Sequence, residues 1–164
     1  MTDNTIHIRE ANTADISLLS RLIRQSYRDV ADRFNLTTAN CPKHPSNCTD
    51  EWIENDFGRG VIYFILEHGG LPAGCVAIER ANADLCYLER LAVLSHERQN
   101  GFGSQLVEHV FRTARKFGSK KISIGIIAAQ TELKHWYLKF GFSESETKEF
   151  RHLPFMVTFM TCEL

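Results

Sequence analysis

The sequence of 164 residues contains no apolar run that approaches the ~18 residues of a transmembrane helix, so we expect no membrane span. Its first residues, Met1 to Asn4, hold neither a basic segment nor an apolar one, and we therefore expect no signal peptide. An excess of basic residues is also missing, because 19 Lys and Arg face 20 Asp and Glu for a net charge of −1. Proteins that bind the phosphate backbone usually carry such an excess, so nucleic acid is not an expected partner.

Cysteine and proline are few. The five cysteines form an odd set at irregular spacing, at positions 41, 48, 75, 86 and 162. This pattern favours free thiols in a reducing compartment over a disulfide framework, so we expect a cytoplasmic protein. With only four prolines and no linker that could divide the chain, residues 1–164 are expected to form a single domain. A hydrophobic fraction of 43% is enough for a sizeable core.

The spacing of the apolar residues predicts a mixed α/β (α+β) protein. Spacing of three and four residues predicts helices at roughly 14–33, 50–57, 106–117 and 133–140. Alternating or continuous apolar runs predict strands at 6–9, 61–66, 73–79, 85–94 and 122–126, and in the tail near 142–149 and 155–163. The expected fold is a mostly antiparallel central sheet with flanking helices. One parallel strand–helix–strand crossover joins the strand that ends at Leu94 to the strand around Ile122.

A glycine-rich loop, Arg98-Gln99-Asn100-Gly101-Phe102-Gly103-Ser104, leads from a strand directly into a helix. Glycine allows close approach of a ligand to the backbone, and the first helical turn exposes unpaired N–H groups, so the loop suits a pyrophosphate. Arg98 could add a charge-assisted contact. A dinucleotide fingerprint would need a third glycine where Leu106 stands, and a phosphate loop of the Walker A type would need a Gly-Lys-Ser/Thr sequence. A turn that only caps the helix is the other interpretation.

A second motif lies at the end of the next helix, where Tyr137 is followed by Gly141 and Phe142 in a Tyr-x-x-x-Gly-Phe pattern. With the Arg-x-x-Gly-x-Gly loop and the order of elements, this motif resembles the GNAT superfamily, the GCN5-related N-acetyltransferases. The resemblance covers residues 6–163 and is strongest over 87–142. It implies an enzyme, an acetyl-CoA-dependent N-acetyltransferase in which a primary amine attacks the thioester directly in a ternary complex. The alternative is a module of the same fold that binds CoA or acyl-CoA as a sensor without turnover.

The resemblance also implies the residues that bind acetyl-CoA. The backbone of Leu91, Ala92 and Val93 would hydrogen-bond the pantetheine arm. The N–H groups from Arg98 through Gln99, Asn100, Gly101, Phe102 and Gly103 to Ser104 would surround the pyrophosphate. Gln130 stands where the family often has Asn, one methylene shorter, which leaves its contact with CoA open.

Glu89 and Tyr137 are the candidate catalytic residues. By the period of two along a strand, Glu89 shares a face with Leu85, Tyr87, Leu91 and Val93, and apolar neighbours should raise the pKa of its carboxyl. Such a carboxylate suits a general base for an ammonium substrate, and the Tyr-Leu-Glu phrase at 87–89 resembles the spermidine/spermine acetyltransferases, whose Glu at this place is the proposed base. The alternatives are substrate binding or a solvent-facing side chain. Tyr137 would lie beside the CoA sulfur and protonate or hydrogen-bond the departing thiolate, whereas core packing is its other interpretation.

The segment from Thr37 to Thr49 predicts a loop that contains Cys41, His44 and Cys48. These are ligand types for zinc, but a structural site needs four ligands, so we expect no metal. A substrate-facing loop or a plain surface loop fits as well, and a zinc-stabilised interaction domain is the weakest functional alternative. The expected acceptor is a small-molecule amine or a protein amino group. Homodimers are common in the family, and a homodimer is possible for this chain. The apolar tail at 155–160 could form its interface.

Overall fold

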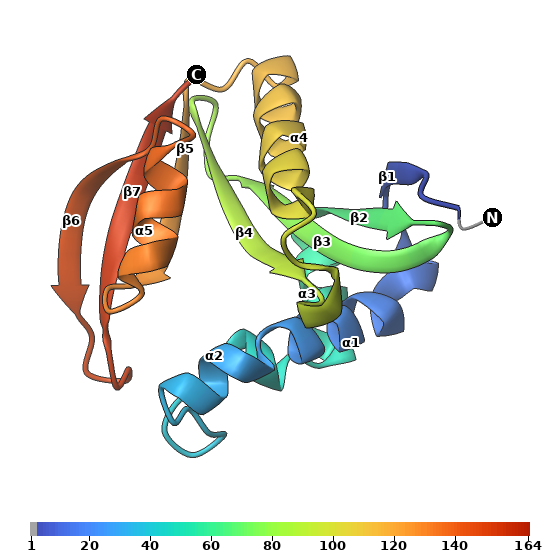
Figure 1. Cartoon of the computed structure of the whole chain (residues 1–164). Coiled ribbons are helices and arrows are strands. Elements are labelled where there is room, and N and C mark those ends of the chain that lie inside the picture. The colour runs from blue at the N-terminus through green and yellow to red at the C-terminus, as the bar shows by residue number, and fades with distance from the viewer. Residues whose placement is uncertain (1–2) are drawn as a thin grey trace.

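The computed structural model describes residues 3–164 as a seven-stranded sheet with helices on both faces (Figure 1). The strands lie in the order β1-β2-β3-β4-β5-β7-β6, and only β4 and β5 run parallel. The strands are β1 (Ile6–Glu10), β2 (Ile62–His68), β3 (Leu71–Arg80), β4 (Leu85–Val93), β5 (Lys121–Ile127), β6 (Ser143–Glu149) and β7 (Met156–Glu163). The helices are α1 (Ile16–Ser26), α2 (Arg28–Arg33), α3 (Asp50–Gly58), α4 (Phe102–Lys116) and α5 (Thr131–Leu138). None of the helices within 3–164 is long and apolar enough to cross a membrane.

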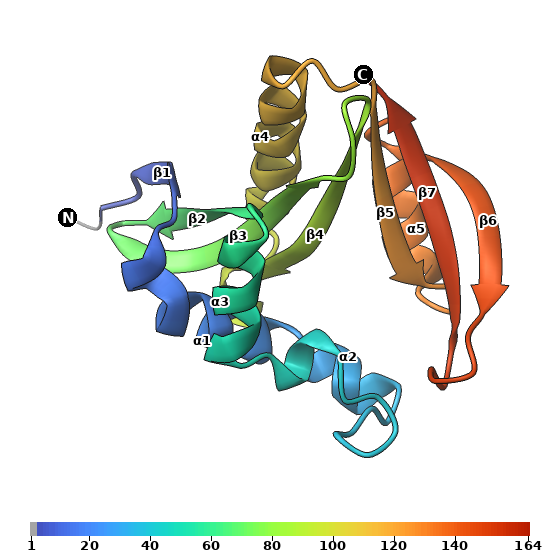
Figure 2. The ribbon, with the colours of Figure 1, turned by 180° about the vertical axis from the view of Figure 1, so that it is seen from behind.

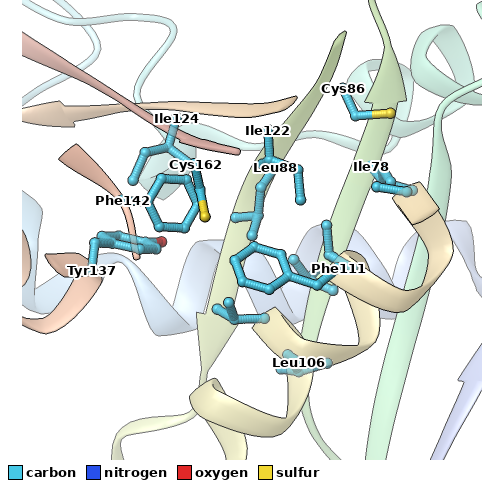
Figure 3. Close-up of a cluster of buried hydrophobic side chains, with 14 of the residues drawn as sticks. Ile78, Cys86, Leu88, Leu106, Phe111, Ile122, Ile124, Tyr137, Phe142 and Cys162 are labelled. Carbon is cyan, nitrogen blue, oxygen red and sulfur yellow. The ribbon is translucent and has the colours of Figure 1, made fainter. Parts of the chain in front are cut away.

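Two buried clusters lie on opposite faces of the sheet. On one face, α4 and α5 pack over Leu88, Ile122 and Met160, and Figure 3 shows this cluster with Leu106 and Phe111 of α4. On the other face, α1 and α3 cover β2, β3 and β4. Figure 2 shows this second face, on which β5, β7 and β6 carry no helix within the described residues. β6 is exposed along its whole length and forms one edge of the sheet.

The predicted mixed sheet with its single parallel crossover is confirmed, and the element order agrees with one exception. The helix expected over 14–33 is interrupted. Asn12 caps a short 3₁₀ turn at Thr13–Asp15, α1 follows, and Tyr27 leaves helical geometry (φ −97°, ψ 3°) before α2 begins. A single interrupting residue does not shift the apolar spacing, so the pattern alone could not reveal the break.

A buried carboxylate fixes β4 against α3. Asp56 of α3 is 2% exposed and accepts a hydrogen bond of 2.5 Å from the hydroxyl of Tyr63. The guanidinium groups of Arg59 and Arg90 lie 3.1 and 3.5 Å from its oxygens. An unpaired buried carboxylate is costly, so Asp56 keeps its partners close. The ion pair with Asp56 therefore holds Arg90, and with it the middle of β4, in one place.

β4 changes direction at Arg90. Its pairing with β3 skips Arg90 and Leu91 opposite the single residue Val76, and Arg90 adopts a left-handed φ of 51°. This is a β-bulge, which bends a strand and increases its twist. On its other side, β4 pairs with β5 only over Leu85–Tyr87. Beyond these residues the two strands diverge, as Figures 1 and 2 show, and the gap between them positions the site described next.

Candidate acetyl-transfer site

A cleft of about 760 Å³ opens where the end of β4, the start of α4, the α1–α2 junction and α5 meet. Most of the predicted binding residues line it together, while Asn100 does not. The lining from the predicted set consists of Leu91, Ala92, Val93, Arg98, Gln99, Gly101, Phe102, Gly103, Ser104, Gln130 and Tyr137. The size exceeds that of a typical water pocket and is in the range of cofactor sites.

The loop before α4 presents backbone N–H groups to this cleft. Gln99 and Gly101 adopt left-handed φ angles of 67° and 77°, which turn the chain sharply into the helix. Within residues 3–164 the N–H groups of 99–104 donate no hydrogen bond, and the first helical bond of this turn comes from Gln105 to the carbonyl of Gly101. Unpaired N–H groups and the positive end of a fifteen-residue helix dipole together favour an anion here.

The side chains of the loop hold the loop itself. The guanidinium of Arg98 pairs with Asp29 at 2.5 Å and donates to the carbonyls of Ser26 (2.6 Å) and Val93 (3.1 Å). The donors of Arg98 already join α1, α2 and β4. Its position therefore does not favour the predicted charge-assisted contact with a ligand. Asn100 donates to the carbonyl of Glu97.

Phe102 is buried against the ring of His68, with the ring centroids 5.1 Å apart. His68 in turn lies 2.8 Å from the carboxylate of Glu97, just before the loop. Because its ring is packed away, Phe102 is left with its main chain to offer to the cleft. The side chains of Arg98, Asn100 and Phe102 thus contact other parts of the protein, and the loop is left to offer backbone groups to a ligand.

The end of β4 offers main-chain groups to the same cleft. Ala92 pairs with Cys75 of β3, so the alternation of an antiparallel ladder turns the main-chain groups of Leu91 and Val93 the other way, toward the gap. The carbonyl of Leu91 accepts a hydrogen bond of 2.7 Å from the hydroxyl of Tyr27. The carbonyl of Val93 accepts from Arg98, as described above.

Tyr137 is 5% exposed, and its ring centroid lies 5.0 Å from that of Trp136 and 5.4 Å from that of Phe142. Figure 3 shows Tyr137 beside Phe142. Burial raises the pKa of its phenol well above the ordinary value, and the neighbouring Tyr27 raises it further. The hydroxyl therefore stays protonated at neutral pH and can donate a hydrogen bond into the cleft. Tyr137 therefore both packs against its aromatic neighbours and lines the cleft.

Glu89 lies on the other side of the gap. It lines a groove of about 410 Å³ on the second face of the sheet, beside the strands β5, β7 and β6 that carry no helix there within the described residues. The groove is also lined by Tyr87, Ser123, Gly125, Ser145, Glu146 and Phe159 among others. Its pKa is raised to about 7, mainly by burial and then by the neighbouring carboxylate of Glu79, while Arg90 opposes the shift. A carboxyl that titrates near neutral pH is suited to accept a proton there.

The face predicted for Glu89 is wrong in part. The bulge at Arg90 adds one residue to the strand, so Leu91 and Val93 pack with the α4 cluster, beside Leu88. Glu89 lies instead on the α3 side, where it faces Glu79, Arg90 and Asp56. Period-two counting from Glu89 fails at this point because it assumes an unbroken strand.

The loop of residues 37–49 is exposed over 37–40 but buries several side chains further along. Cys41, His44 and Cys48 are each buried, and a 3₁₀ turn at Pro45–Asn47 shapes the segment. The ring of His44 stacks edge-on against Tyr27, and burial lowers its pKa to about 4, so it is neutral at pH 7. The described residues contain no cluster of three or more metal-ligating side chains. The loop supports the Tyr27 wall of the cleft from outside.

A model of the acetyltransferase (GNAT) family matches residues 24–142, which is more than half of the chain. The chain belongs to this family. The PaiA N-acetyltransferase of Thermoplasma acidophilum, solved with coenzyme A, superposes with a TM-score of 0.81 at 15% identity and covers 98% of this chain and 99% of that one. The ribosomal-protein-S18-alanine N-acetyltransferase of Escherichia coli superposes with a TM-score of 0.79 at 15% identity, over 97% and 94% of the two chains. These likenesses establish the GNAT fold that the two sequence motifs predicted.

The curated relatives are longer proteins. The amino-acid acetyltransferases of Neisseria meningitidis serogroups A and B are each 30% identical to this GNAT chain over 150 residues, which is 89% of it. The chain spans only about 30% of their length. The N-acetylglutamate synthase of Neisseria gonorrhoeae, complexed with coenzyme A and N-acetyl-glutamate, superposes with a TM-score of 0.69 at 23% identity, over 98% of this chain and 35% of that one.

One wall of the cleft was not predicted from the sequence. It consists of residues from the α1–α2 junction and α5, namely Ser26, Tyr27, Asp29, Val30, Arg33, Glu132 and Trp136. Leu133, which stands where the family commonly has Ala and predicts a tighter CoA groove, lines the same wall. Arg33 and Glu132 form an exposed ion pair that joins α2 to α5. The amphipathic spacing of the predicted helices placed Tyr27, Val30, Leu133 and Trp136 on their buried faces. Nothing in the sequence pointed to Ser26 as a cleft residue.

We expect Gly101→Ala to weaken CoA binding and Gly118→Ala to leave it unchanged. The two glycines bracket α4, share a φ of 77°, and have nothing within 4 Å of an added Cβ, so each substitution should destabilise the free protein by about 1 kcal/mol. Only the methyl at 101 would stand in the cleft, where we expect roughly a tenfold loss of affinity, or about 1.4 kcal/mol. Calorimetric titration of both variants with CoA checks this. Equal affinities would mean that the loop is only a helix cap.

Proposed function

We propose that this protein is an acetyl-CoA-dependent N-acetyltransferase that acts on a primary amine by direct attack in a ternary complex. The observation that carries the proposal is the placement of two groups on either side of one gap. Tyr137 and the unpaired N–H groups of residues 99–104 line the cleft on one face, and Glu89 lines the groove on the other. The free, buried state of all five cysteines also favours the cytoplasm as its compartment.

The cleft fits acetyl-CoA in both charge and chemistry. The N–H groups at the start of α4 would bind the pyrophosphate, and the main-chain groups of Leu91 and Val93 would bind the pantetheine arm, whose amides suit a free strand edge. Ala92, predicted with them, turns its main-chain groups toward β3 instead. Gln130 lies at the start of α5 on the cleft wall, within reach of the same arm. Bound in this way, acetyl-CoA would supply the acetyl thioester at the gap between β4 and β5.

The amine would approach from the groove on the opposite face. Glu89 accepts the proton of the acceptor ammonium, directly or through a water, so that the free amine nitrogen can bond to the acetyl carbon. As the carbon–sulfur bond breaks, the hydroxyl of Tyr137 donates its proton or a hydrogen bond to the departing thiolate. The second proton of the nitrogen is then lost, to the Tyr137 oxygen if that has given its proton away and otherwise to solvent, which leaves a neutral amide. No step needs a covalent cysteine intermediate. Burial raises the pKa of Cys75 to about 12, which keeps its thiol protonated.

The lining of the groove limits the acceptor. Glu89 and Glu146 contribute carboxylates, Tyr87 and Phe159 contribute aromatic rings, and no Lys or Arg side chain of the described residues lines it. Lys148 lies 3.3 Å from Glu146 and offsets part of that charge. Such a surface suits an amine without a nearby carboxylate. The Neisseria relatives are named for amino acids as acceptors, whereas the groove of this chain favours an amine without a carboxylate.

A panel of amines tests the enzyme against the sensor alternative. We expect thiol release from acetyl-CoA, matched by acetylated product, with higher kcat/KM for putrescine or butylamine than for L-glutamate. Equal detection of thiol and product distinguishes transfer from hydrolysis. Tight CoA binding without turnover on any amine, including lysine and N-terminal peptides and an aminoglycoside, would favour the sensor. A clear preference for L-glutamate would contradict the acceptor argument and leave the transfer reaction in place.

Glu89→Gln should lower kcat/KM roughly 10²-fold or more at neutral pH, because it removes the proton acceptor and keeps the shape of the side chain. In the parent protein the rate should rise as pH increases through about 7, since the carboxylate must lose its proton to act as a base. The variant should lack this rise and bind CoA normally. Glu54→Gln, an exposed change on α3, is the control. A parent-like pH profile in Glu89→Gln would assign the proton to another acceptor.

Tyr137→Phe should reduce kcat by about 10- to 1,000-fold while CoA affinity persists, because the hydroxyl is needed only as charge grows on sulfur. The ring contacts with Trp136 and Phe142 remain, so the melting temperature should change little. Steady-state kinetics on the best amine, with a CoA titration of the same variant, make the measurement. Full turnover in Tyr137→Phe would show that the residue only packs.

A further inference from the structure

A second carboxylate, that of Glu79, lies beside Glu89 on the same face of the β3–β4 hairpin. In the register of these strands, Glu79 is opposite Tyr87 and Ala77 is opposite Glu89. Glu79 and Glu89 are therefore diagonal neighbours, and long side chains in such positions can reach one another. The two side chains are close enough to share a hydrogen bond. The residue directly opposite Glu89 carries only a methyl group, so Glu79 is its polar cross-strand neighbour.

The two carboxyl groups have unequal partners. Glu79 lies 3.5 Å from the guanidinium of Arg59, which follows α3 and also lies 3.1 Å from Asp56. None of the ion pairs within residues 3–164 includes Glu89. A hydrogen bond between two carboxyl groups needs one proton, because an ionised carboxylate can only accept. Since Arg59 stabilises a negative charge on Glu79, the shared proton belongs to Glu89.

The other charged groups around Glu89 come from β4, α3 and the groove. Arg90 of β4 favours its ionised form, and Asp56 of α3 opposes it. These two groups lie 3.5 Å apart and pair with each other, so each offsets part of the effect of the other. Arg59 faces Glu89 from the end of α3. The groove adds two titratable groups, Tyr87 and Glu146. Besides burial, the carboxylate on β3 therefore has the largest influence on the proton of Glu89.

We propose that Glu79 is a positioning residue that makes Glu89 a stronger base, by holding a negative charge beside it and by fixing its carboxyl group through a hydrogen bond. This inference rests on the proposed role of Glu89 in amine acetylation. An ordinary carboxylate is a weak acceptor for the proton of an ammonium group, whose pKa is about 10. A base with a higher proton affinity takes that proton more readily. The proton that Glu89 accepts then lies between the two carboxyl groups, and Arg59 balances the charge that remains on Glu79.

Glu79→Gln tests this proposal, because the amide keeps the shape and the hydrogen-bonding capacity of the side chain and removes its charge. The proton affinity of Glu89 should fall, so the rise of kcat/KM with pH should move to lower pH by about one pH unit or more. Since the parent titrates at about 7, the rate at about pH 6 relative to about pH 8 should then increase roughly fivefold or more. The rate on the upper plateau should decrease, because Glu89 becomes a weaker base.

Two measurements check this result. The first is the pH–rate profile of parent and variant with the best amine. The second is an NMR titration of the carboxyl carbon of Glu89 in the CoA-free proteins, which does not depend on turnover. In Glu79→Gln both should move to lower pH together.

Glu67→Gln is the matched control. Glu67 lies on β2, away from the groove, and its carboxylate is 3.6 Å from the guanidinium of Arg9. Its side chain is 23% exposed, against 25% for Glu79, so each variant loses a similar ion pair. The melting temperatures of both variants should change little and to a similar degree, because partly exposed ion pairs contribute little to stability. The pH–rate profile of Glu67→Gln should match that of the parent.

The outcomes separate this inference from the proposed function. A parent-like rate profile and a parent-like titration of Glu89 in Glu79→Gln would overturn the inference. A titration that shifts while the rate profile stays in place would overturn it as well, because Glu89 would then not be the base. A parent protein that acetylates no amine would remove the proposed function, and the NMR titration would still decide whether Glu79 acts on Glu89.

Discussion

The separation of β4 from β5 is the constraint on which the rest of the structure depends. Within residues 3–164 these strands are the single parallel pair, and they share only three residues of pairing before they part. A sheet that stayed paired would leave no free main-chain groups at its centre. Two features keep the strands apart: the bulge at Arg90, held by the carboxylate of Asp56, and the bonds from Tyr27 and Arg98 to the carbonyls of β4. The helix layers then cover the two halves of the sheet unequally, which leaves one face of β5 open.

The site divides its work between backbone and side chains. In the proposed mechanism, charge recognition at the start of α4 would depend on N–H groups, whose direction is set by the left-handed residues Gln99 and Gly101. The neighbouring side chains, among them Arg98 and Phe102, make contacts that keep that backbone in place. Proton transfer, in contrast, would depend on two side chains whose pKa values are both raised by burial, Glu89 and Tyr137. One stays protonated at neutral pH and the other is poised to exchange its proton, which is the pairing an acid and a base require.

Local patterns were sufficient for most of the fold. The amphipathic stripe of α4, the alternation of β5 and the two glycine motifs each depend on neighbours in the chain, and their predictions agree with the structure. The errors fell where a residue is set by contacts far away in sequence. The face of Glu89 depends on the bulge that Asp56 stabilises, and the role of Arg98 depends on Asp29, 69 residues earlier. The Ser26–Tyr27 wall was missed for the same reason, because its place is defined by β4 rather than by its own helix.

The exposed strand β6 affects how copies of this protein meet. A free sheet edge can pair with another edge, and many proteins prevent this with charged side chains. The seven residues of β6, Ser-Glu-Ser-Glu-Thr-Lys-Glu, carry three carboxylates and one ammonium group, and all seven are exposed. Two such edges brought together would place like charges opposite one another without apolar contact to compensate. The excess of carboxylates on β6 therefore disfavours the pairing of this edge with the same edge of a second copy.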